Sequence, residues 1–181
     1  MVLVLAVVAL VFLLYQTATS DRPSRPPGLA PNQQVYVSAR KKWDDFNRDS
    51  SIRVLTLSDA EINSLLAKAP EVGFLAGGAT VTSRENGIQL QLSVPVKIIP
   101  FYTKYINADV FLRPIITGEN VDLNIYGVDA EGRPLDAASL QRFKSQAQPA
   151  IDIILTGANQ WEGPRAIHEI RLQNGSIALL R

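Results

Sequence analysis

The chain has 181 residues, with 18 Lys or Arg, 17 Asp or Glu and no cysteine, which is enough for one ordinary domain with additional segments. The absence of cysteine excludes a disulfide scaffold, thiolate metal sites and a lipoprotein anchor through cysteine. A net charge of +1 gives no reason to expect a nucleic-acid partner.

The first twenty residues carry no charged side chain, and every residue from Val2 to Tyr15 is apolar or aromatic. As a helix this run would be about 21 Å long, and residues 16–19 would extend it to a marginal span of a hydrocarbon core of about 30 Å. We interpret residues 1–20 as a transmembrane anchor or an uncleaved signal. Two alternatives stay open. Ala18-Thr19-Ser20 has the small residues of a signal-peptidase site, and the run could also be a buried core helix.

The charges beside this run bear on topology. Arg22 and Arg25 follow it, and the positive-inside rule taken alone would put the domain in the cytoplasm. The rule needs both flanks, and we interpret the upstream flank as missing from this sequence. We therefore expect the domain on the extracytoplasmic side, in the cell envelope or periplasm.

Residues 21–32 follow as a proline-rich linker, with four prolines in the eleven residues DRPSRPPGLAP. Such composition is typical of an extended, semi-stiff spacer that would hold a domain off the membrane. The alternative is an ordinary connecting loop. We expect one α+β domain over residues 33–181.

A helix is predicted over Gln33–Arg48, because apolar residues recur there at helical spacing. Val35, Ala39, Trp43 and Phe46 form that stripe. Lysines and aspartates occupy most of the other face, which we interpret as a solvated surface and not as a phosphate-binding patch.

The stretch RVLTLSDAEINSLLAKAP predicts a short strand followed by a helix. Ser58 and Glu61 have the spacing of a capping box, and Leu57 and Ile62 that of a hydrophobic staple. Pro70 ends the run. Since each polar residue has a structural role, we interpret the motif as helix initiation and not as a catalytic site.

From Ala79 the apolar residues recur every second position, which predicts strands. Asn86-Gly87 predicts a type I′ hairpin turn, and we expect a break bracketed by Pro95 and Pro100. The result is an antiparallel meander with one apolar and one wet face. Its apolar face would carry Ile88, Leu90, Leu92 and Val94, then Ile106, Ala108, Val110 and Leu112, then Val121, Leu123 and Ile125.

A second helix is predicted after the turn GRPLD, with Asp136 as its cap and an apolar stripe that continues to Leu155. Pro149 lies inside the stripe and should kink the helix. A hairpin ends the chain, with Ala166–Leu172 and Ser176–Leu180 as strands and Asn174-Gly175 as the turn.

Few residues point to catalysis. His168 is the only histidine, and we interpret it as a packed or half-buried strand residue and not as a base. Asp109 and Asp122 fall on neighbouring predicted strands, on the wet face, as is typical of a solvated sheet. The sequence contains neither a G-x-S-x-G nor an H-E-x-x-H motif. We therefore expect no enzymatic activity, no catalytic residue, no metal and no cofactor.

The connection PVKIIPFYTKY concentrates apolar and aromatic residues around two lysines and two prolines. Loops usually lie on the surface, so this stretch predicts an exposed apolar patch or the mouth of a cavity. Lysines beside aromatic residues suit a lipid headgroup boundary. The alternative is that these residues fold back into the core.

Three stretches in this order, LTLSDAEINSLL, VDLNIYGVDAEGRPLD and EIRLQNGSIALLR, carry a resemblance over about residues 52–181. The chain resembles bacterial membrane-anchored envelope proteins of uncharacterised function, whose "lt-x-x-E-l-N-x-l-l" segment opens a domain similar to one half of a tubular lipid-binding (TULIP-type) module. The resemblance implies acyl chains held between a long helix and a curled sheet, and no catalytic residues. Pro149 departs from the smooth helix that this family pattern implies.

The predicted fold is therefore α+β: a curled antiparallel β-meander packed against one long helix, kinked at Pro149, with an N-terminal transmembrane or signal helix. The predicted function is to bind or shuttle a lipid in an apolar groove, with the membrane as partner through the N-terminal helix. The alternative is a non-enzymatic envelope scaffold with a solid core, which would contact its partner through the sheet edge or the Trp43 helix. The predicted ligand-binding residues are Leu90, Leu92, Ile98, Phe101, Tyr102, Tyr105, Val110, Leu112, Leu123, Phe143 and Ile154.

Overall fold

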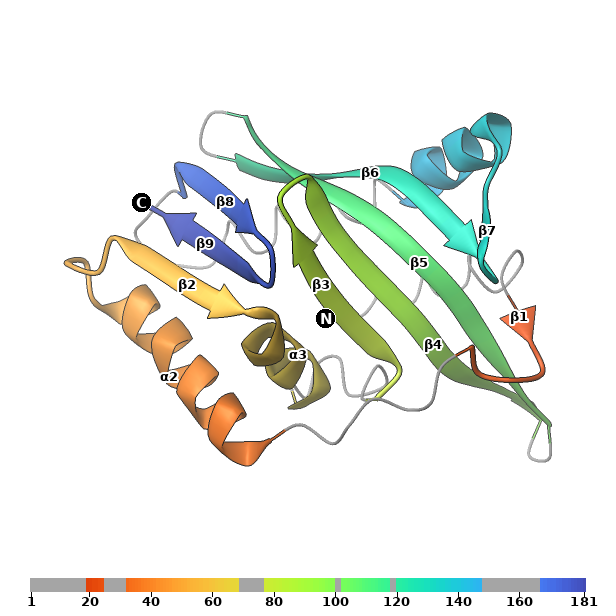
Figure 1. Cartoon of the computed structure of the whole chain (residues 1–181), viewed down its shortest axis with the longest axis horizontal. Coiled ribbons are helices and arrows are strands. Elements are labelled where there is room, and N and C mark those ends of the chain that lie inside the picture. The colour runs from red at the N-terminus through yellow and green to blue at the C-terminus, as the bar shows by residue number, and fades with distance from the viewer. Residues whose placement is uncertain (1–18, 25–31, 69–76, 100–101, 118–119, 148–166) are drawn as a thin grey trace.

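The computed structural model of the chain describes residues 19–24, 32–68, 77–99, 102–117, 120–147 and 167–181 (Figure 1). It is a mixed α+β structure with antiparallel sheets, as predicted. The elements in chain order are β1 (Thr19–Ser20), α2 (Gln33–Arg48), β2 (Val54–Ser58), α3 (Asp59–Lys68), β3 (Ala79–Arg84), β4 (Gly87–Ile99), β5 (Tyr102–Thr117), β6 (Asn120–Ala130), β7 (Arg133–Pro134), β8 (Glu169–Gln173) and β9 (Ser176–Leu180). A third helix covers residues 137–147.

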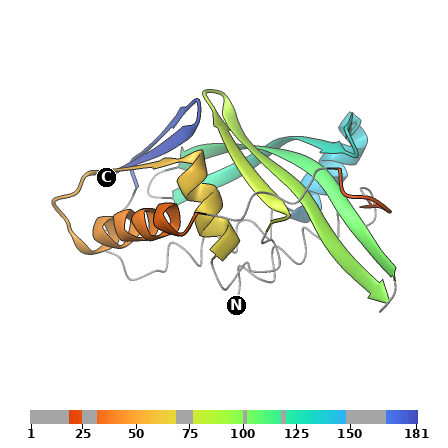
Figure 2. The ribbon, with the colours of Figure 1, turned by 60° about the horizontal axis from the view of Figure 1, so that its bottom comes forward.

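The large sheet is the predicted meander. Its strands follow the order β3-β4-β5-β6-β7, each antiparallel to the next, and β1 pairs separately with β5. The long strands β4, β5 and β6 twist together across the molecule (Figures 1 and 2). Period-two alternation therefore predicted the pairings from β3 to β6 correctly, because consecutive hairpins need only local turns. The pairings of β1 with β5 and of β6 with β7 were not predicted.

One face of this sheet is apolar, also as predicted. Its buried residues form one cluster with two side chains of the third helix, and the exposed fractions range from 0 to 8%. The cluster consists of Leu92, Val94, Ile106, Ala108, Val110, Ile125, Val128, Ala130, Phe143 and Ala147.

The apolar face shifts phase within β6. Phe111 lies opposite Gly127 and Leu112 opposite Ile125, so Tyr126 is an extra residue on β6. After this bulge the buried positions continue at Val128 and not at residue 127, as expected when one strand gains a residue against its partner.

Strand β4 continues through Pro95, and the predicted break there is wrong. Ser93 donates its backbone N–H to Gly78 on the β3 side of β4. Backbone N–H groups alternate sides along a strand, so an N–H at position 95 would face the same side. The paired part of β3 begins at Ala79, opposite Leu92. Because no β3 residue pairs with Pro95, its missing N–H costs the ladder nothing.

The first hairpin has its turn one residue earlier than predicted. Arg84 pairs with Gly87, so Glu85 and Asn86 form the turn. Gly87 is needed for another reason: a Cβ there would lie 2.8 Å from the Leu112 carbonyl oxygen and 2.8 Å from the Tyr126 hydroxyl. The hairpin that pairs Ala130 with Arg133 turns through Glu131 and Gly132, whose φ angles of 53° and 78° fit a type I′ turn.

A second, three-stranded sheet has the order β2-β9-β8. The predicted C-terminal hairpin is confirmed, with Gly175 at φ 83° in its turn. Its strand β9 pairs with β2, so Leu55 lies opposite Leu179. Helices α2 and α3 cover this sheet around a second apolar cluster that comprises Ala39, Phe46, Leu55 and Leu57, with Trp43, Ile52, Ile62, Leu65 and Leu179 at its margin.

The helix of residues 137–147 begins as predicted. Asp136 Oδ1 accepts a hydrogen bond from the Ser139 N–H at 2.8 Å. The predicted kink at Pro149, Ile154 and the continuation to Leu155 lie outside the described residues.

Within the described ranges, none of the helices has the length and hydropathy to cross a membrane. Residues 1–18 lie outside those ranges, so the N-terminal anchor stays a prediction. Thr19 belongs to a strand, which means that any helical span must end before it.

Candidate functional site

The apolar face of the large sheet brings together most of the predicted ligand-binding residues that the structure describes. Leu92, Val110 and Phe143 are buried in the apolar cluster, and Leu90 and Leu112 pack at its margin. Leu90 lies directly opposite Val110, so β4 and β5 present these side chains side by side. Periodicity alone predicted this arrangement.

The remaining predicted residues lie toward the ends of the long strands. Leu123 and Tyr105 are half-buried, and Tyr105 pairs with Pro95. Ile98 is in β4 and Tyr102 in β5, where the two strands approach their connection. Phe101 and Ile154 lie outside the described residues.

The centre of the apolar face is tightly packed. Ile106 and Ile125 have 0% of their surface exposed, and Val110 has 1%. A side chain that lined a water-sized void would keep part of its surface accessible to a water probe. Space for a ligand is therefore expected at the half-buried margin, beside Leu90 and Leu112, and not at the centre.

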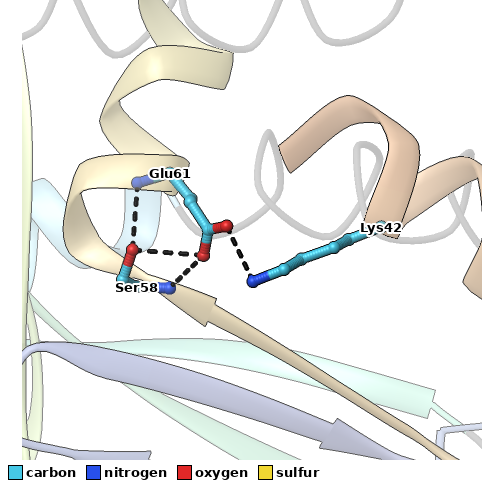
Figure 3. A network of polar contacts seen from close by, with 3 residues as sticks. All are labelled: Lys42, Ser58 and Glu61. Carbon is cyan, nitrogen blue, oxygen red and sulfur yellow. Dashed lines mark hydrogen bonds and ion pairs between the residues drawn. The ribbon is translucent and has the colours of Figure 1, made fainter. Parts of the chain in front are cut away.

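A groove lies elsewhere, between α2 and the start of α3, with a volume of about 560 Å³. Its walls are Gln34, Val35, Ser38, Lys42, Ser58, Ala60 and Glu61. Here Glu61 accepts hydrogen bonds from the Ser58 N–H at 2.9 Å and the Ser58 hydroxyl at 3.1 Å (Figure 3). The Glu61 N–H donates to Ser58 Oγ at 3.3 Å, which confirms the predicted capping box.

Lys42 adds an ion pair to this groove, with Nζ 2.7 Å from Glu61 Oε1 (Figure 3). Burial opposes ionisation of the carboxyl group, but the hydrogen bonds from Lys42 and Ser58 outweigh it and lower the pKa of Glu61. Both carboxylate oxygens thus bind groups of the protein itself. These contacts join α2 to α3, in keeping with the interpretation of the motif as helix initiation.

The same motif holds the edge of strand β3, which sequence reasoning missed. Asn63 accepts the Val81 N–H at 2.6 Å and donates to the Val81 carbonyl at 2.8 Å. The Asp59 carboxylate accepts the Ser83 N–H at 3.0 and 3.1 Å. Asp59 and Asn63 stand four residues apart on one helix face. That spacing was the available signal, but nothing in the sequence indicated which backbone they would bind.

This contact continues to the hairpin of the small sheet. Asp59 donates its N–H to the Gly175 carbonyl at 2.9 Å, and Gly175 donates its N–H to the Ser83 carbonyl at 3.0 Å. The start of α3, the β3 edge and the β8–β9 turn therefore meet at one point, which we call the sheet junction.

The Asn107 side chain also holds a distant backbone segment, which the sequence did not predict. We call its hydrogen bonds the Asn107 clamp. Asn107 is 4% exposed, although its position is on the predicted wet face. Its Oδ1 accepts the Ser24 N–H at 3.0 Å and the Ser93 hydroxyl at 2.9 Å, and its Nδ2 donates to the Arg22 carbonyl at 2.9 Å. Residues 19–24 thus dock on the large sheet, and this part of the predicted linker is not a free spacer.

The other candidates for chemistry are dispersed. His168 is exposed, so its interpretation as a packed or half-buried strand residue is wrong: it precedes β8, and only its N–H is fixed, by the Leu180 carbonyl. Asp109 pairs with Asp129, whereas Asp122 pairs with Ile115. Among the described residues, no three His, Asp or Glu side chains gather as a metal site would require.

No family model matches the chain, and no curated protein matches it. The resemblance to envelope proteins with a TULIP-type half-domain therefore stays a prediction.

Proposed function

We propose that this chain is a membrane-anchored envelope domain that binds the acyl chain of a lipid along the apolar face of the large sheet. The observation that supports this most is the continuity of that face across β4, β5 and β6. The paired residues Leu90 and Val110, then Leu92 and Ala108, succeed one another along β4 and β5. Each methylene of an acyl chain buried against such a surface would contribute about 0.8 kcal/mol.

The binding place in this proposal is the margin of the cluster. Leu90, Leu112 and Leu140 are only partly buried and pack around the fully buried centre. An acyl chain would extend this layer, as a further apolar strip between the sheet and the helix that starts at residue 137. A longer helix, kinked at Pro149, would cover it.

Residues 1–18 would hold the domain at the membrane, with the domain on the extracytoplasmic side. The run from Val2 to Tyr15 would supply about 21 Å of the anchor as a helix, and residues 16–18 would extend it toward a marginal span. In this proposal the protein has no enzymatic role, and lipid is its ligand.

The test is to purify the full chain in detergent, extract it with organic solvent and measure bound lipid by mass spectrometry. Uptake of a fluorescent fatty acid gives a second reading. We expect about one lipid per chain, because the proposal gives the chain one binding place, at the margin of one cluster. A folded protein that neither carries lipid nor takes up the fatty acid would overturn the proposal.

Two substitutions on β5 provide a matched pair for this test. Leu112 packs at the cluster margin, whereas Ile115 is 41% exposed. Leu112→Gln is expected to reduce fatty-acid uptake about tenfold, and Ile115→Gln to leave it unchanged. Equal uptake by the two variants would show that the fatty acid binds elsewhere.

A scaffold with a solid core is the second candidate, and the complete burial of Ile106 and Ile125 favours it. Its partner would bind the sheet edge or helix α2, where Val37 is 54% exposed and Trp43 is half-buried. This function predicts that the folded chain carries no lipid and that Leu112→Gln and Ile115→Gln behave alike.

A further inference from the structure

Strands β4 and β5 extend beyond their neighbours as a two-stranded arm. Strand β3 pairs with β4 only as far as Leu92, and β6 pairs with β5 only as far as Ala108. Beyond these residues β4 and β5 stay paired with each other, from Val94 opposite Ile106 to Ile99 opposite Tyr102. Figure 2 shows this arm, residues 94–99 and 102–106, projecting from the rest of the sheet.

The chain that follows the N-terminal apolar run is attached at the base of the arm. Thr19 pairs with Ile106 and Ser20 with Tyr105. The Asn107 clamp then holds Arg22 and Ser24 over the neighbouring part of the sheet. The first described residues are thus part of the large sheet.

This attachment limits how far the arm can lie from the end of the apolar run. The four residues from Tyr15 to Thr19 can span at most about 14 Å. Along β5, the four residues from Ile106 to Tyr102 cover about 13 Å. The arm is therefore about as long as the connection. Because β1 runs from Thr19 toward the arm's end, that end reaches a membrane that holds residues 1–15 if the connection turns back along the arm.

The composition of the arm suits such a surface. Between Val94 and Ile106 the sequence VPVKIIPFYTKYI contains no acidic residue and two lysines, Lys97 and Lys104. Tyrosine is enriched at the membrane–water interface, and lysine is attracted to anionic headgroups. Apolar residues dominate the rest of the arm.

We propose that the β4–β5 arm, whose sequence holds two lysines and no acidic residue, contacts the surface of a bilayer that contains anionic lipid, and that the docked residues 19–24 hold it there. This proposal rests on the anchor in the proposed function and names the partner of that anchored domain. It also puts the Ile106 end of the apolar face next to the membrane from which a lipid would come.

The test uses a single introduced cysteine, since the natural chain has none. Thr103→Cys puts an environment-sensitive fluorophore on the arm, opposite Lys97. Arg48→Cys is the control, because Arg48 is exposed at the end of α2, on the side of the molecule away from the arm (Figure 1). The full chain is reconstituted in phosphatidylcholine vesicles with and without phosphatidylglycerol, and nitroxide-labelled lipids serve as quenchers.

We expect quenching at position 103 at least threefold above that at position 48, and stronger with phosphatidylglycerol present. The double variant Lys97→Glu, Lys104→Glu should lose the increase with phosphatidylglycerol. Equal quenching at positions 103 and 48 in both kinds of vesicle would overturn the proposal. Quenching at 103 by a nitroxide-labelled free fatty acid in detergent, without vesicles, would instead indicate a soluble ligand.

The Asn107 clamp is tested in the same vesicles. Asn107→Leu removes all three hydrogen bonds and is expected to lower quenching at position 103 at least twofold, with an unchanged far-ultraviolet spectrum. Asn107→Asp keeps the two acceptor bonds, to Ser24 and Ser93, and should retain more of the quenching if Asn107→Leu unfolds the chain. Unchanged quenching in both variants would contradict the role given to residues 19–24.

The two proposals fail separately. Lipid recovered from the purified chain, together with equal quenching at 103 and 48, would leave lipid binding and remove the arm contact. Quenching at 103 without recovered lipid would leave the arm contact and remove lipid binding. A chain that sodium carbonate strips from the vesicles has no anchor, and both proposals then fall.

Discussion

Asn63 pairs with the backbone of strand β3 as a further strand would. Its amide group both accepts from and donates to Val81, so the edge residue keeps both of its backbone hydrogen bonds. An open edge strand invites pairing with other chains. A helix that covers the edge through side-chain amide and carboxylate groups removes that risk and also fixes the helix position.

Replacing Asn63 is expected to be costly because the backbone groups of Val81 would lose their partners in a part-buried place. Asn63→Ala should lower the free energy of unfolding by about 1–3 kcal/mol. Urea denaturation measures the change, and Asn124→Ala, at an exposed position of β6, is the matched control. Equal midpoints for the two variants would show that the hydrogen bonds between Asn63 and Val81 contribute nothing to the free energy of unfolding.

Glu61 makes part of the stability depend on pH. Its pKa in the folded chain is lowered from the model-peptide value of 4.5, so the group stabilises the fold fully above that value. This contribution is lost as the pH falls through the lower folded pKa. Since the side chain of Lys42 is 46% exposed, the ion pair itself is expected to contribute less than about 1 kcal/mol.

Glu61→Gln keeps a capping side chain but removes the charge. We therefore expect a constant loss of stability relative to the natural chain above about pH 5, which shrinks at lower pH and disappears below the folded pKa. Unfolding midpoints measured from pH 3 to 8 provide the comparison. Glu85→Gln, which changes an exposed carboxylate in the turn between β3 and β4, is the control. A loss that grows toward acid pH would contradict the sign argued for Glu61.

At the scale of elements, features set by neighbouring residues were predicted well. The capping box of α3, the Asp136 cap and the alternation of β5 depend on residues within one turn or one hairpin. The errors come from distant partners. Pro95 is tolerated because no residue of β3 lies opposite it. Gly87 is required because a Cβ there would collide with the hydroxyl of Tyr126, which follows almost forty residues later in the chain.

In the candidate site, too, the features set by neighbouring residues were predicted and those set by distant residues were not. The apolar face follows from alternation and was predicted from Leu90 to Ile125. The hydrogen bonds of Asn63 and Asn107 were not predicted, because Asn63 and Val81 are 18 residues apart, and Asn107 and Ser24 are 83 apart. A polar residue on a wet face is normally solvated, whereas Asn107 is buried where residues 22 and 24 of the docked segment hydrogen-bond to it. No local pattern indicates such a contact.

At the scale of the molecule, the residues that the structure describes form two apolar clusters, one under each sheet. The pairing of β2 with β9 connects the beginning of the domain to its end. Meanders fold from local contacts, whereas such a pairing must close a long loop first. The sheet junction at Asp59, Ser83 and Gly175 is where the two sheets share hydrogen bonds, so we infer that it makes the unfolding of both sheets one event.

This inference predicts that Asp59→Ala separates the two sheets in denaturation. The substitution leaves the Ser83 N–H without its carboxylate and removes a charge that suits the first turn of α3. In a Trp161→Phe background, Trp43 is the only tryptophan and reports on the small cluster, while hydrogen exchange of the β4 and β5 amides at each urea concentration follows the large sheet. In the chain that keeps Asp59, the two unfolding transitions should coincide, because the sheets unfold together. With Asp59→Ala the Trp43 transition should come at lower urea, by a difference that Asp45→Ala on the exposed face of α2 does not produce. Coincident transitions in the Asp59 variant would mean that packing, and not the junction, couples the sheets.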